Sequence, residues 1–489
     1  MFAKIKSYLS FDRPAHLLAF FMLISGLLWV IQTSLLQNIL PLDVVEAVVW
    51  GNQMQLGQMK SPPLSGWLAA AFWHLSGGGD WALYLLAQLT VWVGLWFVYK
   101  LAREFTDGYG AATAVLLLCF LCYYNPPAMK FCSHDTQIAL LPAMTYYFVR
   151  AVRDDRLKDW LLLAVFSALA VLGKYSAVQL LIAYAAVMAA TGIGRKRLAS
   201  YKPYLCAAVL LLLAPHIVWV FRHDFLSVAH MRERLEKSGG KFYQPFWNLL
   251  IMLYPYISCG FVLLLASLPL KNAVREHRDG RRRTLSLLLP VALIPPGIYF
   301  LLSVCGESLV EQWFSYFSYM SGVVVVLLWP FRCGRREFKR AFILLSVCMV
   351  FLLIGTTVDL LVKPRFRIHT RPRDIVTAGE DFWRRHRVDD SPLEVAYGDR
   401  WLAGVMELYS PSHPAACDSR DICAWELVRE RVRKNGMLLV SKDVPPPKPK
   451  FLPETDQAEI VCEKHTVCFR TPNGKRKKQD IWFGYLPPR

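Results

Sequence analysis

The sequence lacks the features that mark several common classes of protein. Its formal net charge is +19, but no base-stacking module or nucleic-acid recognition motif accompanies that charge. His and carboxylate residues do not cluster at the spacing of metal ligands. The first apolar run, near residues 15–35, is not followed by a small-residue cleavage site. These absences argue against nucleic-acid binding and a metal centre, and the first run is predicted to be a signal anchor.

Hydrophobic residues, by contrast, are abundant and gathered into long runs. They make up 55% of the 489 residues, and the mean hydropathy is +0.31. Apolar runs able to cross a hydrocarbon core of about 30 Å recur up to about residue 362. We predict a mostly α-helical polytopic bundle of about eleven spans, with an interfacial helix in the Trp-rich stretch 62–75. The spans lie near 15–35, 82–99, 111–124, 137–151, 159–173, 176–193, 204–221, 247–270, 285–303, 315–331 and 340–362.

The basic residues occur in every second loop. Examples are Arg150, Arg153 and Arg156, and the run Arg195 to Arg197, whereas the first of the alternate loops is acidic. This is the positive-inside pattern of a protein whose basic loops face the cytoplasm. It predicts a multi-pass protein of the bacterial inner membrane with a cytoplasmic N-terminus, and contacts with anionic lipids account for the excess charge.

Composition changes after about residue 362, where apolar runs shrink and charges become frequent. We therefore predict a transmembrane domain over 1–362 and a small periplasmic α/β domain over 363–489. Helices are expected near 375–386, 401–409 and 424–434, and strands at 393–397, at 437–441 and, flanking a turn, around Val461 and Cys468.

Four cysteines fall in this C-terminal domain: Cys417, Cys423, Cys462 and Cys468. Their spacing does not fit a zinc knuckle. Disulfides are the better interpretation and suit an oxidising compartment. We predict the local pairs Cys417 with Cys423 and Cys462 with Cys468, the second pair across a hairpin.

The loop after the first span carries residues suited to chemistry. Asp43 and Glu46, three positions apart, share one side of a helical turn at the membrane surface. Lys60 follows at a distance suited to a phosphate, and Pro62-Pro63 fixes the chain before the interfacial helix. A solvated loop with incidental charges is the alternative interpretation.

This loop, with Trp50-Gly51, Gly57, Lys60, Pro62-Pro63-Leu64 and Trp67, resembles the first loop of the GT-C membrane glycosyltransferases. The branch it resembles is the protein O-mannosyltransferase and lipid A aminoarabinose transferase superfamily. Further matches follow in family order: Asp135, the Gly173-Lys174-Tyr175-Ser176 motif, Pro215, Trp219 to Phe225, Gln312-Trp313, Tyr397 to Ala403 and Asn435-Gly436. The first loop departs from the commoner form, in which the two carboxylates are adjacent.

The resemblance implies sugar transfer, with inversion, from a polyprenyl-phosphate donor to a lipid, glycan or protein acceptor. The acceptor oxygen needs a carboxylate and the departing phosphate needs cations. The resemblance gives Asp43, Glu46 and Asp135 as catalytic candidates, with the choice of base between the first two open. The candidates for substrate binding are Lys60, Lys174, Tyr175, Arg222, His223, Gln312 and Trp313. It implies no organic cofactor, and it leaves room for a divalent cation.

Several of these residues have a simpler structural interpretation. Asp135 could cap a helix, Lys174 could extend its ammonium towards the interface, and Arg222 and His223 could be interfacial residues. His216 is better explained as a packed polar residue than as a ligand. A transporter or flippase of lipid-linked substrates is the rival function, and a non-catalytic assembly subunit is a third, but intramembrane charges and repeated halves are not evident.

Overall fold

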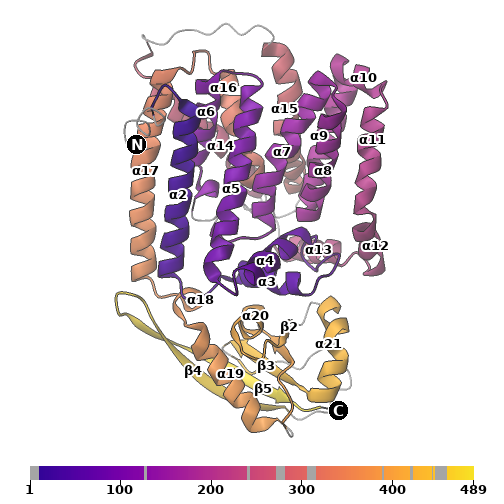
Figure 1. Cartoon of the computed structure of the whole chain (residues 1–489), viewed down its shortest axis with the longest axis vertical. Helices are drawn as coiled ribbons and strands as arrows, with labels where there is room; N and C mark the ends of the chain where they lie inside the picture. The colour runs from indigo at the N-terminus through magenta and orange to yellow at the C-terminus, as the bar shows by residue number, and fades with distance from the viewer. Residues whose placement is uncertain are drawn as a thin grey trace.

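The computed structural model describes residues 10–125, 129–238, 243–270, 281–305, 315–387, 390–418, 422–442, 444–446 and 460–488. Long helices run side by side through the larger part of the molecule, and a five-stranded sheet with its own helices lies at one end (Figure 1). The helices of the larger part are α2 (Pro14–Leu36), α5 (Asp80–Arg103), α6 (Gly108–Cys119), α7 (Ser133–Asp154), α8 (Leu157–Gly173), α9 (Val178–Ala190), α10 (Gly192–Leu198), α11 (Lys202–Val209), α12 (Ala214–Arg222), α14 (Gln244–Ser267), α15 (Arg281–Val304), α16 (Tyr319–Leu328) and α17 (Arg335–Val362).

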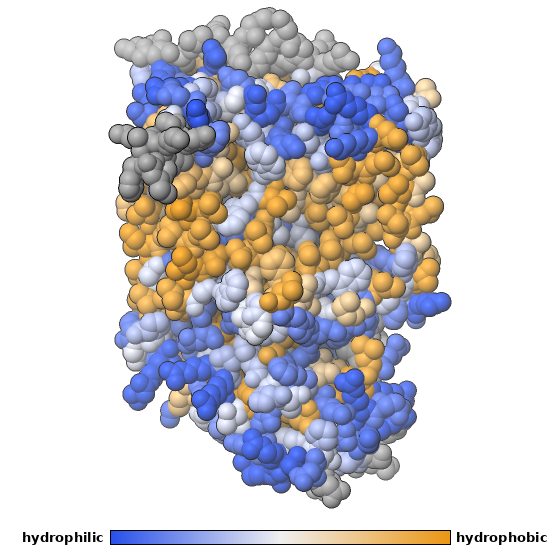
Figure 2. Space-filling view, in the orientation of Figure 1, coloured by the Kyte–Doolittle hydropathy of each residue, from blue (hydrophilic) through white to orange (hydrophobic). Residues whose placement is uncertain are grey.

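These helices form a membrane bundle. Within the described residues, six helices are long and apolar enough to cross a membrane, or seven if the bent pair around Thr191 is one span. Helices suit this solvent because each satisfies its own backbone polar groups. Figure 2 shows an apolar band across the visible face of the bundle, with hydrophilic surface on both sides of the band, as in a multi-pass membrane protein. Each of the eleven predicted ranges falls on a helix or helical run, and the count of eleven spans stays a prediction.

Three shorter helices lie across the end of the bundle that faces the sheet (Figure 1): α3 (Leu42–Asn52), α4 (Leu64–Leu75) and α13 (Leu226–Ser238). Helix α4 occupies the stretch predicted as an interfacial helix. Helices α3 and α4 approach closely because both carry glycine where they meet. A Cβ at Gly51 would lie 2.1 Å from the carbonyl oxygen of Gly66, so only glycine allows this distance.

The smaller part combines helices with one mixed sheet. Its elements are α18 (Phe366–His369), α19 (Pro372–His386), β1 (Val395–Gly398), α20 (Arg400–Tyr409), β2 (Ala415–Cys417), α21 (Ile422–Asn435), β3 (Met437–Lys442), β4 (Val461–Arg470) and β5 (Arg476–Leu486). The strand order is β2-β1-β3-β5-β4, with β1 parallel to β2 and β3, and β5 antiparallel to β3 and β4. The apolar run Met437 to Val440 is fully buried, as expected of a central strand covered on both faces.

Helix α20 joins this part to the first loop of the bundle. Trp401 Nε1 donates to the carbonyl oxygen of Leu40 at 2.9 Å, and Asn52 Nδ2 donates to Glu407 Oε1 at 2.7 Å. Tyr409 OH donates to Asp80 Oδ1 at 2.8 Å. One continuous cluster of buried hydrophobic residues runs from the bundle into this part. Helix α20 therefore fixes the position of α3.

The structure corrects two predictions made for the C-terminal part. Val461 and Cys468 lie on one continuous strand rather than on two strands about a turn, and the turn of the hairpin comes later, between Arg470 and Arg476. Cys462 and Cys468 are both free. Six residues of extended strand separate their backbones by roughly 20 Å, far beyond disulfide reach. The side chain of Cys423 lies outside the described residues, so its pairing with Cys417 stays a prediction.

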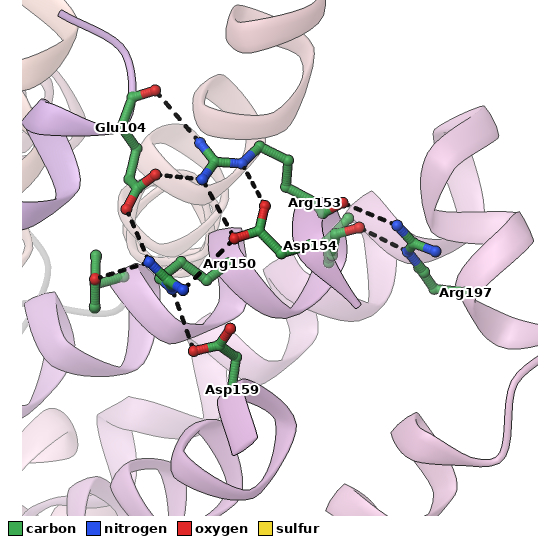
Figure 3. Close-up of polar contacts among 8 residues, drawn as sticks. Glu104, Arg150, Arg153, Asp154, Asp159 and Arg197 are labelled. Atoms are coloured by element: carbon green, nitrogen blue, oxygen red, sulfur yellow. Dashed lines mark hydrogen bonds and ion pairs between the residues drawn. The ribbon is translucent and has the colours of Figure 1, made fainter. Parts of the chain in front are cut away.

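An ion-pair cluster holds the other end of the bundle, where α5, α7, α8 and α10 meet (Figure 3). Arg150 contacts Glu104, Asp154 and Asp159, and Arg153 contacts Glu104 and Asp154. Arg197 donates to the backbone oxygens of Val152 and Arg153. Arg150 and Arg153, which belong to the basic loops of the sequence pattern, are therefore neutralised in large part by neighbouring acids.

Candidate functional site

A cavity of about 810 Å³ lies where the transverse helices meet the end of the bundle. Its walls come from α2, α3, the loop before α4, the start of α7, the junction of α8 and α9, α13 and the end of α17. The cavity brings together six of the residues that sequence singled out: Asp43, Glu46, Lys60, Asp135, Lys174 and Tyr175.

Glu46 is buried and electrostatically neutralised. Lys60 Nζ lies 2.8 Å from Oε1 and 2.6 Å from Oε2. Arg400, at the start of α20, brings Nη1 to 2.7 Å from Oε1 and its Nε to 3.1 Å from Asp418. The Glu46 side chain is only 5% exposed. Two cations thus occupy both oxygens, as a buried carboxylate requires.

Asp43 lies one helical turn before Glu46 and has a different environment. It is exposed and lines the same cavity. Within the described part of the chain, its carboxylate forms no hydrogen bond or ion pair, although its charge acts on nearby Asp135. Of the two first-loop carboxylates, Asp43 is therefore the one whose oxygens face open space.

Asp135 is buried at the start of α7, where its Oδ2 accepts a hydrogen bond from the backbone N–H of Cys132 at 2.8 Å. The predicted cap is therefore present. The same residue lines the cavity, so capping fixes a carboxylate in the cavity wall.

Lys174 follows the last residue of α8 and lies beside α7. Its Nζ is 3.0 Å from His134 Nδ1 and 4.9 Å from the centre of the Tyr316 ring. A Cβ at Gly173 would lie 2.6 Å from Thr136 Oγ1, so the glycine before Lys174 lets α8 reach the start of α7. The ammonium is held inward, against a ring and a histidine, rather than directed into bulk water.

Arg222 and His223 lie at the end of α12 and do not line the cavity. Arg222 is exposed, and the His223 ring stacks on Trp219 with centroids 4.3 Å apart. His216 is buried and bonded to the backbone oxygen of Leu56 at 2.6 Å, as a packed polar residue would be. Gln312 and Trp313 lie outside the described residues.

The cavity also contains residues that the sequence did not single out as site residues. Lys130 is exposed in the cavity wall, and no ion pair or hydrogen bond holds it within the part of the chain that the structure describes. Arg365 pairs with Asp359 at 2.6 Å at the end of α17. Arg400 does not line the cavity, but it reaches Glu46 from the C-terminal part. Lys130 lies shortly before the His134-Asp135 pair, and this position in the sequence could have identified it as a site residue. Nothing in the sequence near Arg400 indicates its contact with Glu46.

Among the described residues, no group of three or more His, Cys, Asp or Glu side chains is arranged to hold a metal ion.

Comparisons with known proteins agree with the resemblance seen in the sequence. Residues 60–219 match the family described as dolichyl-phosphate-mannose-protein mannosyltransferase. That stretch contains Lys60, Asp135, Lys174 and Tyr175. No curated protein sequence matches the chain.

Two solved structures are similar over nearly their whole length. The crystal structure of ArnT from Cupriavidus metallidurans bound to undecaprenyl phosphate superposes with a TM-score of 0.58 at 12% identity, covering 95% of this chain and 97% of that one. The apo structure of the same protein gives a TM-score of 0.57 at 14% identity with the same coverage. The chain therefore has the GT-C fold, and its resemblance to the protein O-mannosyltransferase and lipid A aminoarabinose transferase superfamily is confirmed.

Proposed function

We propose that this chain is an inverting glycosyltransferase that moves a sugar from a polyprenyl-phosphate donor to a lipid, glycan or protein acceptor. One observation carries the proposal: a single cavity at the membrane boundary combines Asp43, whose carboxylate no described residue binds, with the cations Lys130 and Lys174. The matching family is described by a dolichyl-phosphate-mannose donor, and the similar ArnT structure contains undecaprenyl phosphate. Both are consistent with a lipid phosphate in this cavity.

Asp43 is the proposed base. It would accept the proton of the acceptor hydroxyl while that oxygen attacks the anomeric carbon from the face opposite the leaving group. The bond between the anomeric carbon and the phosphate oxygen breaks, and the lipid phosphate leaves with the electron pair. Glu46 suits this role less because Lys60 and Arg400 hold both its oxygens. We assign Glu46 to positioning Lys60 beside the base.

Lys174 and Lys130 are the proposed partners of the departing phosphate. A hydrogen bond to a charged group contributes roughly 1.5 to 3 kcal/mol, and two such contacts would stabilise the negative charge that develops on the leaving oxygen. Tyr316 and His134 hold the Lys174 ammonium in place. Arg222 and His223 do not line the cavity, so we do not assign them this role.

The arrangement also supports a two-part chain in the bacterial inner membrane. We propose that residues 1–362 form the transmembrane domain, that 363–489 form a periplasmic domain, and that the cavity opens on the periplasmic side. Helix α17 ends at Val362, and the soluble domain contributes Arg400 to the site.

Binding of undecaprenyl phosphate to the purified full-length chain tests the donor site. Native mass spectrometry should show a bound lipid, and Lys174→Gln and Lys130→Gln should each weaken binding on the order of tenfold. Lys158→Gln, at an exposed lysine near the opposite end of the bundle, is the matched control and should bind as the wild type does. Equal binding by all four proteins would remove the lysines from the phosphate site.

A further inference from the structure

The hairpin of β4 and β5 carries an exposed basic cluster at its turn. It consists of Arg470, Lys475, Arg476, Lys477 and Lys478, and all five side chains are exposed. None of the five forms an ion pair with an acidic residue of the described chain. The nearby Asp480 is bonded to Thr466 and paired with Lys464, so most of the positive charge of the hairpin is not compensated.

The pairing register of β4 and β5 means that the basic cluster lowers the stability of the fold. Arg470 lies directly opposite Arg476 across the two strands, and like charges in such a pair destabilise a sheet. Residues 476–480 of β5 pair with β4 only, because the β3 pairing begins at Ile481. Charges on an exposed strand edge discourage aggregation, but one or two lysines suffice for that purpose. Binding to an anionic partner explains the presence of five cations better than protection from aggregation does.

The hairpin lies beside the membrane boundary. Helix α17 ends at Val362, and α18 begins four residues later at Phe366. The Phe366 ring packs against Phe469, with centroids 5.7 Å apart, and Phe469 directly precedes Arg470. Figure 1 shows the turn of the hairpin next to the end of α17, and Figure 2 shows hydrophilic surface there, directly below the apolar band. The headgroup layer adds several ångströms beyond the hydrocarbon, which brings these cations within reach of it.

We propose that the basic cluster of the β4–β5 hairpin binds anionic lipid headgroups on the membrane face that carries the soluble domain. Long, flexible cations that remain hydrated suit a fluid layer of phosphates, and all five side chains of the cluster are exposed. The contact holds the distal end of the sheet, and through Phe366 the end of α17, against the bilayer. This role is independent of sugar transfer, so either proposal can fail without the other.

Photo-crosslinking of the full-length chain in lipid nanodiscs tests the proposal. The nanodiscs contain phosphatidylglycerol or phosphatidylcholine with a photoreactive headgroup, and the labelled peptides are identified by mass spectrometry. Wild type should label the 470–480 region several-fold more with phosphatidylglycerol, and high salt should reduce this difference. The variant R476Q/K477Q/K478Q should lose at least about tenfold of the labelling, because each cation near a surface contributes about fivefold.

A control variant tests whether the labelling depends on the cations of the hairpin or on the total positive charge of the chain. R384Q/R431Q/K434Q removes three exposed cations from α19 and α21 and should label as the wild type does. The control variant should unfold at the wild-type temperature, because its substituted side chains are exposed. The hairpin variant should unfold at that temperature or slightly above it, because it removes the like-charge pair of Arg470 and Arg476. Equal labelling with both lipids, or unchanged labelling of the hairpin variant, would overturn the proposal. Competition by inorganic phosphate beyond that of sodium chloride at equal ionic strength would instead indicate a free-anion site and would also overturn it.

Discussion

At the scale of single residues, the difference between Asp43 and Glu46 decides the chemistry that the cavity can perform. Both carboxylates lie on the same side of α3, yet only Glu46 is enclosed by cations. The ammonium of Lys60 and the guanidinium of Arg400 occupy the oxygens of Glu46, so a substrate hydroxyl has no free carboxylate oxygen to approach there. Asp43 keeps its oxygens available, which makes it the base in this account.

Arg400 connects Glu46 with Asp418 and should stabilise the chain. Arg400→Ala removes a cation shared by two mostly buried carboxylates, and we expect a loss on the order of 1 to 3 kcal/mol, since Arg400 is itself 30% exposed. Arg400→Lys should lose less, because it keeps the charge but not the fork that reaches two partners. Thermal unfolding of the purified variants measures this, with exposed Arg431→Ala as control. An Arg400→Ala variant as stable as the wild type would contradict the assignment.

At the scale of elements, the contact between α3 and α4 sets the distance from Asp43 and Glu46 to Lys60. We predict that Gly51→Ala destabilises the chain by about 1 to 3 kcal/mol, because the added Cβ would lie 2.1 Å from the Gly66 carbonyl oxygen. Gly260→Ala in α14 is the matched control, since its added Cβ would meet no atom within 4 Å. Unfolding temperatures of the two variants should differ clearly. If they coincide, the close approach of α3 and α4 does not constrain the site.

The contact between α3 and α20 should respond to pH through Glu407. Burial raises the pKa of the Glu407 carboxyl from 4.5 to about 7, although Asn52 and the Ala416 backbone N–H both donate to it. A pKa that is higher in the folded state means that the folded chain holds its proton more tightly than the unfolded chain. Stability is therefore greatest below the unfolded pKa and falls as the pH rises from about 4.5 to about 7.

Unfolding temperatures measured across that window test the Glu407 prediction. The glutamine in Glu407→Gln cannot titrate. Across the window, the free energy of unfolding of this variant should therefore change less than that of the wild type, by on the order of 2 to 3 kcal/mol. Glu430→Gln on α21, where the native side chain is 85% exposed, should follow the wild type. Parallel pH profiles for wild type and Glu407→Gln would show that Glu407 does not couple to folding.

The β4–β5 hairpin is the element whose position the sequence did not predict correctly, whereas the helices of the C-terminal part were predicted. The helices near 375–386, 401–409 and 424–434 formed where periodicity predicted them, because each carries its own apolar stripe. A hairpin was predicted in this region, but its turn was placed between Val461 and Cys468 rather than after Arg470, because the strands are charged and only Val467 and Phe469 mark the buried face of β4. The Asn473-Gly474 pair is the turn signal that could have located it, and Gly474 has the positive φ of 87° that such turns favour.

At the scale of the whole molecule, the bundle could be predicted because membrane helices are local features of hydrophobicity. The six cavity residues were also predicted from the sequence, because they belong to motifs that occur along the chain in the order of the family that it resembles. The approach of Arg400 to Glu46 could not be predicted. It depends on how the C-terminal part packs on α3, through contacts such as Trp401 with Leu40 and Gly404 with Val45, and no local pattern encodes such a long-range contact.

The orientation of the chain is a further prediction at this scale. Alkaline phosphatase folds only where its disulfides can form, so a fusion at the C-terminus should be active in bacteria, whereas a fusion to a chain truncated after Arg197 should be inactive. The physical reason is the positive-inside rule, which predicts that the basic loops face the cytoplasm. The reverse pattern of activities would place the cavity and the soluble domain in the cytoplasm.

Sugar transfer in the cavity should depend on Asp43, and complementation of a deletion strain measures that dependence. Lipid A, surface glycans and periplasmic proteins from a deletion strain are compared by mass spectrometry after complementation with wild type, Asp43→Asn or Glu46→Gln, each at matched expression. The account predicts that one of these products loses the mass of a sugar in the deletion strain. Wild type should restore that sugar, Glu46→Gln should restore part of it, and Asp43→Asn should restore about a hundredth or less, as expected when a general base is removed. Full restoration by Asp43→Asn, or products of unchanged mass in the deletion strain, would contradict it.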